Sequence, residues 1–199
     1  MADDALECPV RSHIGSMDED RILAAAARDD ADAAGRLYDK YYSEVLGYIY
    51  HCTLDPTVAE DLTANVFLAA FGHIGQYRWR QVPFRAWLFR IATNEVRTHW
   101  RRQRRSRTVA LARDDDSQAA EQSAGDGMAQ AEEYRLLHRA LLELRVKYRT
   151  AIILRYFEDK SIAEICQITG QKEGTIRCQL HRGLARLQDI LVCWGVLPE

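Results

Sequence analysis

A short segment near the C-terminus constrains the fold of this chain more than any other. Ser161 is followed three residues later by Glu164, the capping-box pattern of a helix start. Gly170 then permits positive φ and a sharp turn. From Thr175 onward, Ile176 and the leucines that follow it recur at helical spacing. The segment therefore predicts two short helices joined by a tight turn, a helix-turn-helix.

The second helix of this motif presents polar side chains outward. Cys166 is the small residue that the close crossing of the two helices requires. The outward-facing residues are Arg177, Cys178, His181 and Arg182. Side chains at this place can reach base edges in a major groove. The alternative is a helical hairpin with a solvated basic face, but eleven bases against six acids from Tyr134 to Cys193 favour DNA binding.

The first half of the chain has helical periodicity without strand-like alternation. Leu37, Tyr41 and Val45 recur every four residues, which predicts one apolar helix face. Asp55 and Pro56 fit the N-cap and first turn of the next helix. Both halves thus predict an all-α fold.

A third long helix is expected after Pro83, with arginines on its exposed side. From Arg78 to Arg107 there are ten arginines against one acid, Glu95. Positive charge suits a helix C-terminus through the macrodipole, so a solvated helix end is one interpretation. Six arginines within the eleven residues from Arg97 exceed that need and favour phosphate contact.

Polar and aromatic residues near these arginines are candidates for base contact. Asn94 lies on the Arg97 side of the helix, where a short amide can bond a base edge. Tyr77, Trp79 and Trp87 could stack on unpaired bases, or equally serve as core aromatics. The preceding residues 21–77 carry four bases and eight acids, which suggests a second surface for a different partner.

A change of composition between Arg113 and Glu133 divides the chain. This stretch is rich in Asp, Gly, Ser and Gln and poor in large apolar residues, as linkers are. We expect two small helical domains joined by a flexible linker, the second with the helix-turn-helix. The expected boundaries are a mobile tail over 1–17, a first domain over 18–108, an acidic linker over 109–132 and a second domain over 133–195.

Several classes of protein are disfavoured. The chain has no run of about 18 apolar residues and its N-terminus has no apolar signal core, which predicts a cytoplasmic protein without membrane insertion. Five scattered cysteines form no C-x-x-C pair and are expected to be reduced, several of them as core fillers. We find no glycine-rich phosphate loop, nucleophile elbow or metal-ligand cluster, so we expect no enzyme activity, cofactor or metal.

Three ordered segments resemble the extracytoplasmic-function branch of the bacterial sigma-70 family. AEDLTANVFLAAF, at 59–71, is similar to the family's core-polymerase-binding helix. FRAWLFRIATNEVR, at 84–97, is similar to its −10-element helix. YRTAIILRYF, at 148–157, with the helix-turn-helix, is similar to its −35-reading domain. The resemblance covers residues 20 to 192 apart from the linker.

The resemblance implies an alternative sigma factor that binds core RNA polymerase and directs initiation at specific promoters. It implies that the first domain is sigma region two and the second is region four. The implied −10 residues are Asn94, Arg97, Thr98, Arg101 and Arg102. The implied −35 residues are Arg177, Cys178, His181 and Arg182. The implied polymerase-binding residues are Asp61, Leu62, Asn65 and Phe67. The implied partners are the β′ clamp helices and β flap of polymerase, promoter DNA and an anti-sigma factor.

The chain departs from the family pattern at several of these positions. Ala64 and Asn65 stand where the family often has Gln-Glu, which removes one acidic contact to polymerase. Cys178 replaces a common Ser, and His181 occupies a variable position, so the promoter preference of relatives does not transfer. The alternative function is a helix-turn-helix regulator that acts without being a polymerase subunit.

Overall fold

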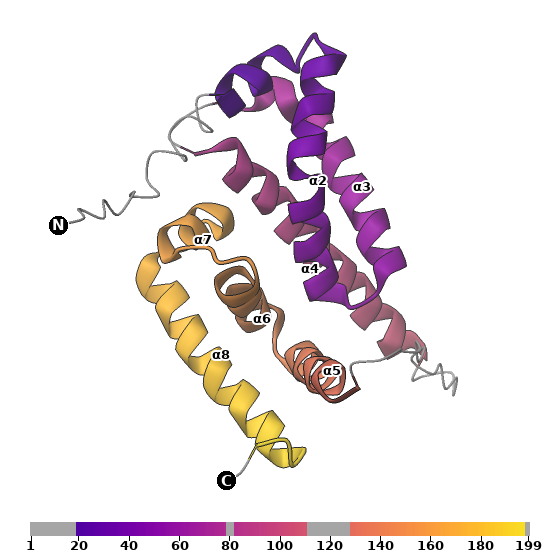
Figure 1. Cartoon of the computed structure of the whole chain (residues 1–199), viewed down its shortest axis with the longest axis vertical. Helices are drawn as coiled ribbons and strands as arrows, with labels where there is room; N and C mark the ends of the chain where they lie inside the picture. Colours follow the sequence, from indigo (N-terminus) through magenta and orange to yellow (C-terminus); the bar gives the residue numbers. More distant parts are fainter. Residues whose placement is uncertain (1–18, 79–81, 111–127, 198–199) are drawn as a thin grey trace, which may run out of the picture.

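The structure is a computed structural model that describes residues 19–78, 82–110 and 128–197, leaving aside the side chains of 104–110 and 128–131. Every regular element in these ranges is a helix (Figure 1). This confirms the expected all-α class. The expected N-terminal tail and residues 111–127 of the expected linker lie outside the described residues.

The first group of helices follows a helical stretch at residues 19–26. Its elements are α2 (Ala31–Thr53), α3 (Pro56–His73), the 3-10 turn η1 (Ile74–Gln76) and α4 (Phe84–Ala110). The expected cap is present, because the Asp55 carboxylate accepts a hydrogen bond from Val58 N at 3.0 Å. Asp30 caps α2 in the same way, accepting from Asp32 N at 2.9 Å.

Aromatic side chains fix α4 on α2. Tyr48 and Phe89 are fully buried, and their ring centroids lie 5.4 Å apart. The hydroxyls of Tyr48 and Thr93 lie 3.0 Å apart in a buried hydrogen bond. Since a buried hydroxyl without a partner is costly, this pairing sets the rotation of α4 about its own axis. The opposite side of α4 is thereby turned away from the core.

The second group contains the expected helix-turn-helix. Its elements are α5 (Met128–Glu143), α6 (Val146–Ile152), the π-helix η2 (Ile153–Phe157), α7 (Ile162–Thr169) and α8 (Glu173–Cys193). Helix α8 begins at Glu173, two residues before the expected start. Helices α4 and α5 both extend into the segment expected to be linker, because that expectation rested on composition alone.

The two groups pack against each other, with α7 beside α4 (Figure 1). Arg90 of α4 donates from Nε to the carbonyl oxygen of Ile168 at 3.3 Å and from Nη2 to that of Gln167. Elsewhere on the contact, His51 Nδ1 of α2 lies 3.2 Å from a carboxylate oxygen of Glu158. No sequence pattern predicted this contact.

A network of charges lies within the contact. Arg85 forms a two-pronged ion pair with Glu44, at 2.8 and 3.0 Å. Lys160, only 3% exposed, reaches from the second group to lie 3.8 Å from Glu44 and 4.6 Å above the Phe89 ring. Burial, with Arg85 nearby, lowers the pKa of Lys160. The buried Lys160 ammonium group thus loses its proton more readily when the two groups of helices pack around it.

The four described cysteines are free. Cys52 is a core filler, and burial raises the pKa of its thiol to about 12. Cys166 of α7 is half-buried and packs against the core. Cys178 and Cys193 are exposed, so the core-filling role expected for several cysteines holds among the described ones for Cys52 and in part for Cys166.

Candidate nucleic-acid interface

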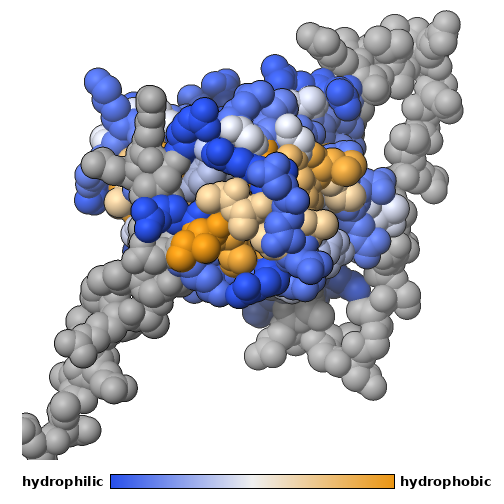
Figure 2. Space-filling view, turned by 90° about the horizontal axis from the view of Figure 1, so that it is seen from above, coloured by the Kyte–Doolittle hydropathy of each residue, from blue (hydrophilic) through white to orange (hydrophobic). Residues whose placement is uncertain are grey.

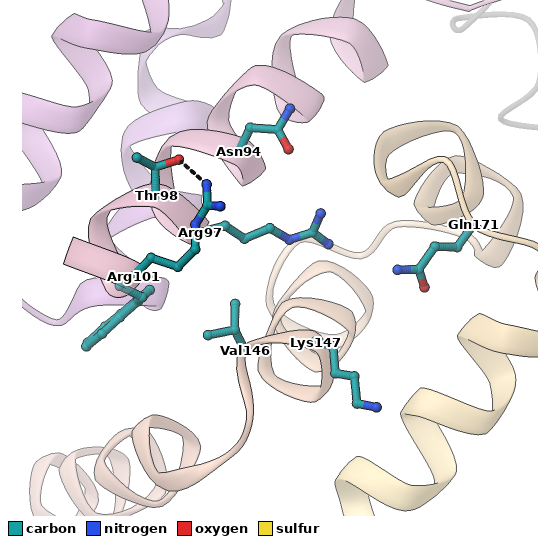
Figure 3. Close-up of a pocket in the computed structure, with 8 residues that line it drawn as sticks. Asn94, Arg97, Thr98, Arg101, Val146, Lys147 and Gln171 are labelled. Atoms are coloured by element: carbon teal, nitrogen blue, oxygen red, sulfur yellow. Dashed lines mark hydrogen bonds between the residues drawn. The ribbon is translucent and has the colours of Figure 1, made fainter. Parts of the chain in front are cut away.

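One face of α4 gathers the residues implied for −10 contact. The core side of this helix buries Phe89, Ala92 and Val96. The remaining side exposes the polar set Asn94, Arg97, Thr98, Arg101 and Arg102, fully or in part. Their spacing of three and four residues brings them onto one stripe, as the helical period requires. Figure 3 shows four of them on the same stretch of α4.

The arginines of this stripe are little constrained by other protein groups. Arg101 donates from Nη2 to the Thr98 hydroxyl at 3.1 Å (Figure 3). This neutral partner leaves its charge uncompensated, which suits a surface that meets phosphate. The side chains of Arg104, Arg105 and Arg107 lie outside the described residues.

The aromatic candidates of the sequence analysis serve the core instead. Tyr77 is buried, and its hydroxyl donates to the carbonyl oxygen of Val82 at 3.0 Å. Its ring lies 4.9 Å from that of Trp87, centroid to centroid. Tyr77 and Trp87 therefore take the core role that was one of the two interpretations, while Trp79 lies outside the described residues.

The helix-turn-helix has the local chemistry expected of it. The Ser161 backbone N–H donates to the Glu164 carboxylate at 2.8 Å, and Glu164 N donates back to the Ser161 hydroxyl at 3.2 Å. The Ser161 hydroxyl also donates to the Glu164 carboxylate, at 2.7 Å. Although burial alone would raise it, the two hydrogen bonds that Ser161 donates to this carboxylate, together with nearby Arg85, lower the pKa of Glu164. Gly170 ends α7 with φ of +70°, a left-handed conformation that favours glycine. Ile176 is fully buried and fixes α8 on α7.

The outer face of α8 carries the residues implied for −35 contact. Arg177, Cys178, His181 and Arg182 are all exposed and lie on one side of its first turns. Arg177 is held by Glu173, with a shortest N–O distance of 2.6 Å. Because both side chains are well exposed, this ion pair contributes little to stability, and Arg177 can exchange its Glu173 partner for a phosphate. The set lies on a different helix from the α4 stripe, so the structure forms two separate basic faces.

Helix α3 divides the residues implied for polymerase binding between two sides. Asp61 and Asn65 are exposed, one turn apart. Leu62 and Phe67 are 7% and 3% exposed and face the core. Leu68, which was not among the residues predicted from the sequence, is 73% exposed and follows Asp61 and Asn65 on the same side of the helix. The helical period was the signal that could have separated the two sides.

Other apolar side chains also reach the surface. Figure 2, seen from above the view of Figure 1, shows apolar side chains among hydrophilic ones on that face. Ile22 is one of the large apolar side chains that are well exposed. Among the described residues, no helix is long and apolar enough to cross a bilayer, and no three His, Cys, Asp or Glu side chains are grouped as metal ligands would be.

Two family models match the chain in the order of the two helical groups. The model of Sigma-70 region 2 matches residues 37–106, which run from within α2 through most of α4. The model of Sigma-70, region 4 matches residues 134–187, which include the helix-turn-helix. The polar stripe of α4 and the outer face of α8 therefore fall in the two regions of a sigma-70 protein.

Curated relatives agree with these matches. The ECF RNA polymerase sigma factor SigL of Mycobacterium tuberculosis is 32% identical over 87% of this chain and 97% of its own length. The ECF RNA polymerase sigma factor BldN of Streptomyces coelicolor is 32% identical over 85% of this chain, which spans 64% of that protein. The chain belongs to the ECF sigma factors of the sigma-70 family, which are non-enzymatic polymerase subunits that direct transcription initiation.

A solved structure supports the fold. The sigma factor RpoE of Bartonella quintana, solved with the anti-sigma factor NepR, superposes with a TM-score of 0.62 at 24% identity. The match covers 79% of this chain and 95% of RpoE. At this identity the likeness concerns the arrangement of the helices.

Proposed function

We propose that the chain reads a promoter through two surfaces, one in each domain. The stripe of α4 formed by Asn94, Arg97, Thr98, Arg101 and Arg102 contacts the −10 element. Its exposed amide suits a base edge, and its arginines suit the phosphates of an opened strand. The domain that carries it extends over residues 18–108. The observation that carries the proposal is this uncompensated polar stripe within the matched region 2.

The second surface is the outer face of α8, within a domain that extends over residues 133–195. Arg177, Cys178, His181 and Arg182 enter a major groove at the −35 element. All four are exposed on the first turns of the second helix of the motif, the part of a helix-turn-helix that reaches base edges. A thiol at Cys178 and an imidazole at His181 give this face its own base preference.

Helix α3 supplies the polymerase contact in this proposal. Asp61, Asn65 and Leu68 form its outward side and meet the β′ clamp helices. Leu62 and Phe67, which lie in the core, act by holding α3 in place. An exposed leucine beside a carboxylate fits the pattern of a protein interface with an apolar centre and a polar rim. The second domain meets the β flap.

Reading both elements at once requires the two domains to separate. Elements centred about 25 base pairs apart lie roughly 85 Å apart along a duplex. A compact chain of this length has a radius of gyration of about 16 Å. The contact of α7 with α4 therefore belongs to a closed form, and the promoter complex uses an open one.

Two further parts of the proposal concern partners and location. An anti-sigma factor holds this chain inactive; in support, RpoE of Bartonella quintana was solved in complex with the anti-sigma factor NepR. Polymerase and promoter DNA lie in the bacterial cytoplasm, and we place the chain there. Neither part depends on the residues of the −10 and −35 surfaces.

Transcription reconstituted with purified core polymerase tests the −10 assignment. Asn94→Ala should slow promoter opening at least tenfold while leaving association with polymerase unchanged. Gln103→Ala is the matched control, since it removes an exposed amide nine residues further along α4, about half a turn around the helix from Asn94. Loss of polymerase association in Asn94→Ala, or equal effects of the two variants, would count against the assignment. Promoter binding without any polymerase-dependent transcript would instead indicate a conventional regulator.

A further inference from the structure

A cavity of about 490 Å³ lies where the two domains meet (Figure 3). One wall comes from α4, with Asn94, Arg97 and Arg101. The other comes from the second domain, with Lys147 at the start of α6 and Gln171 in the turn between α7 and α8. The packing of the domains thus creates a hollow that neither domain forms alone. Its volume is in the range typical of small-molecule sites.

Three cations surround this cavity. Arg97, Arg101 and Lys147 line it, and no Asp or Glu lines it with them. Within the described residues, none of the three has a carboxylate within 4 Å. Lys147 Nζ instead lies 4.9 Å above the ring of Tyr148. Closing the domains therefore gathers like charges around one hollow, and a bound anion would relieve their repulsion.

Neutral donors at the cavity suit the oxygens of a phosphate. The amide oxygen of Gln171 accepts from Gln179 Nε2 at 2.7 Å, which leaves the two N–H bonds of its own amide available. Figure 3 shows the Gln171 side chain extending from its turn toward Arg97. Arginines such as Arg97 and Arg101 bind phosphate with paired donors.

The ligand class follows from the charge, the size and the aromatic wall. The charge of three cationic side chains is balanced by more than one phosphate group, and the cavity has room for a short chain of phosphates. One face of the Trp100 ring is already covered by the Arg149 guanidinium, 4.3 Å from the ring centroid. We propose that this cavity binds a compact polyphosphate through its phosphate groups alone, whether the source is inorganic or a nucleotide.

Binding there would couple to promoter recognition. Because both domains supply walls, the ligand binds the closed form and stabilises it by mass action. Because the ligand occupies Asn94, Arg97 and Arg101, it also competes with the −10 strand. This consequence rests on the function proposed above, whereas binding itself does not. A polyphosphate therefore acts as an inhibitor of initiation by this sigma factor.

Isothermal titration of the full chain with tripolyphosphate, without Mg²⁺ or DNA, tests the site. Lys147→Met should weaken binding at least tenfold. Lys172→Met is the matched control, because it removes an exposed charge from the residue next to Gln171 that does not line the cavity, and it should change binding less than twofold. No binding by the wild type, or equal loss in the two variants, would overturn a composite site.

Parallel titrations separate the two sources of phosphate. ATP and tripolyphosphate should bind within threefold of each other, and adenosine should not bind. ATP binding ten times tighter than tripolyphosphate would overturn recognition through phosphate alone.

Transcription with core polymerase tests the regulatory consequence. Tripolyphosphate should reduce promoter opening by the wild type at least fivefold more than by Lys147→Met, and both reactions experience the same loss of free Mg²⁺. Equal inhibition of the two proteins would overturn the regulation even with a confirmed site. A wild type that gives no transcript without any ligand would refute the proposed function instead, so the two failures are distinguishable.

Discussion

Replacing Arg90 with alanine tests what holds the closed form together. The guanidinium donates to the carbonyl oxygens of Gln167 and Ile168, the latter at 3.3 Å. Both carbonyls belong to the last turn of α7, where no intrahelical partner exists. They also carry the negative end of the dipole of α7. Arg90 therefore caps a helix that belongs to the other domain.

The size of the effect follows from the setting of these two hydrogen bonds. A hydrogen bond from a charged group contributes about 1.5–3 kcal/mol when it is buried. Arg90 is exposed, so water and salt weaken both bonds. We therefore expect Arg90→Ala to destabilise the closed form by about 1–2 kcal/mol in total, which lowers the ratio of closed to open molecules roughly 5- to 30-fold.

Hydrogen–deuterium exchange of the full chain measures this shift at α7. The peptide over residues 162–170 should exchange 5- to 30-fold faster in Arg90→Ala. Arg90→Lys keeps the charge but loses the paired donors, and should give an intermediate rate. Arg36→Ala, which removes an exposed arginine paired with Glu19, is the control and should match the wild type. Exchange of this peptide within twofold of wild type in Arg90→Ala would refute the capping role.

Two further predictions concern stability. His138 is 1% exposed, and burial, with His51 nearby, lowers its pKa to about 4. As pH falls below about 6.5 the unfolded chain takes up a proton that the folded chain binds only near pH 4, so stability should fall by about 2 kcal/mol between pH 7.5 and 5. His138→Phe should remove this loss in urea unfolding at both pH values; the same loss in the variant would exclude His138 as its source. A Cβ at Gly183 would lie 3.0 Å from Ile152 Cδ1, whereas one at Gly174 would meet no atom within 4 Å. Gly174→Ala should therefore stabilise the folded chain by up to about 1 kcal/mol, whereas Gly183→Ala should not. Midpoints of urea unfolding measure both. Equal gains would mean that the Ile152 side chain moves aside without cost.

The sequence predicted the local features of this protein well, because each depends on residues a few positions apart. The cap at Asp55, the capping box of Ser161 and Glu164, and the left-handed turn at Gly170 all appeared where expected. In each, a side chain or a backbone conformation satisfies polar groups within one helical turn. The ordered motifs of α3, α4 and the helix-turn-helix likewise sufficed to indicate the family, which the comparisons confirmed.

The roles of single residues within those motifs depended on tertiary packing. Leu62 and Leu68 are both leucines of one helix, yet one is buried and the other is 73% exposed. Motif resemblance selected Leu62, because it carries no information on which side of α3 meets the core. Tyr77 and Trp87 could have met bases or the core, and only the packing of α4 decided for the core.

The closed arrangement of the domains was decided by the tertiary structure alone. Arg90 caps α7 across 77 and 78 positions of sequence, and Lys147 and Arg97 line one cavity that exists only when the domains pack. Neither role could be predicted from the sequence, because no neighbouring residue distinguishes an exposed arginine or lysine that meets the other domain from one that meets solvent. Helix starts and turns are set by chemistry within one turn of chain, so the sequence alone determined them. Contacts between distant helices depend on which helix faces stay exposed after the core of each domain has packed, and only the tertiary structure shows those faces.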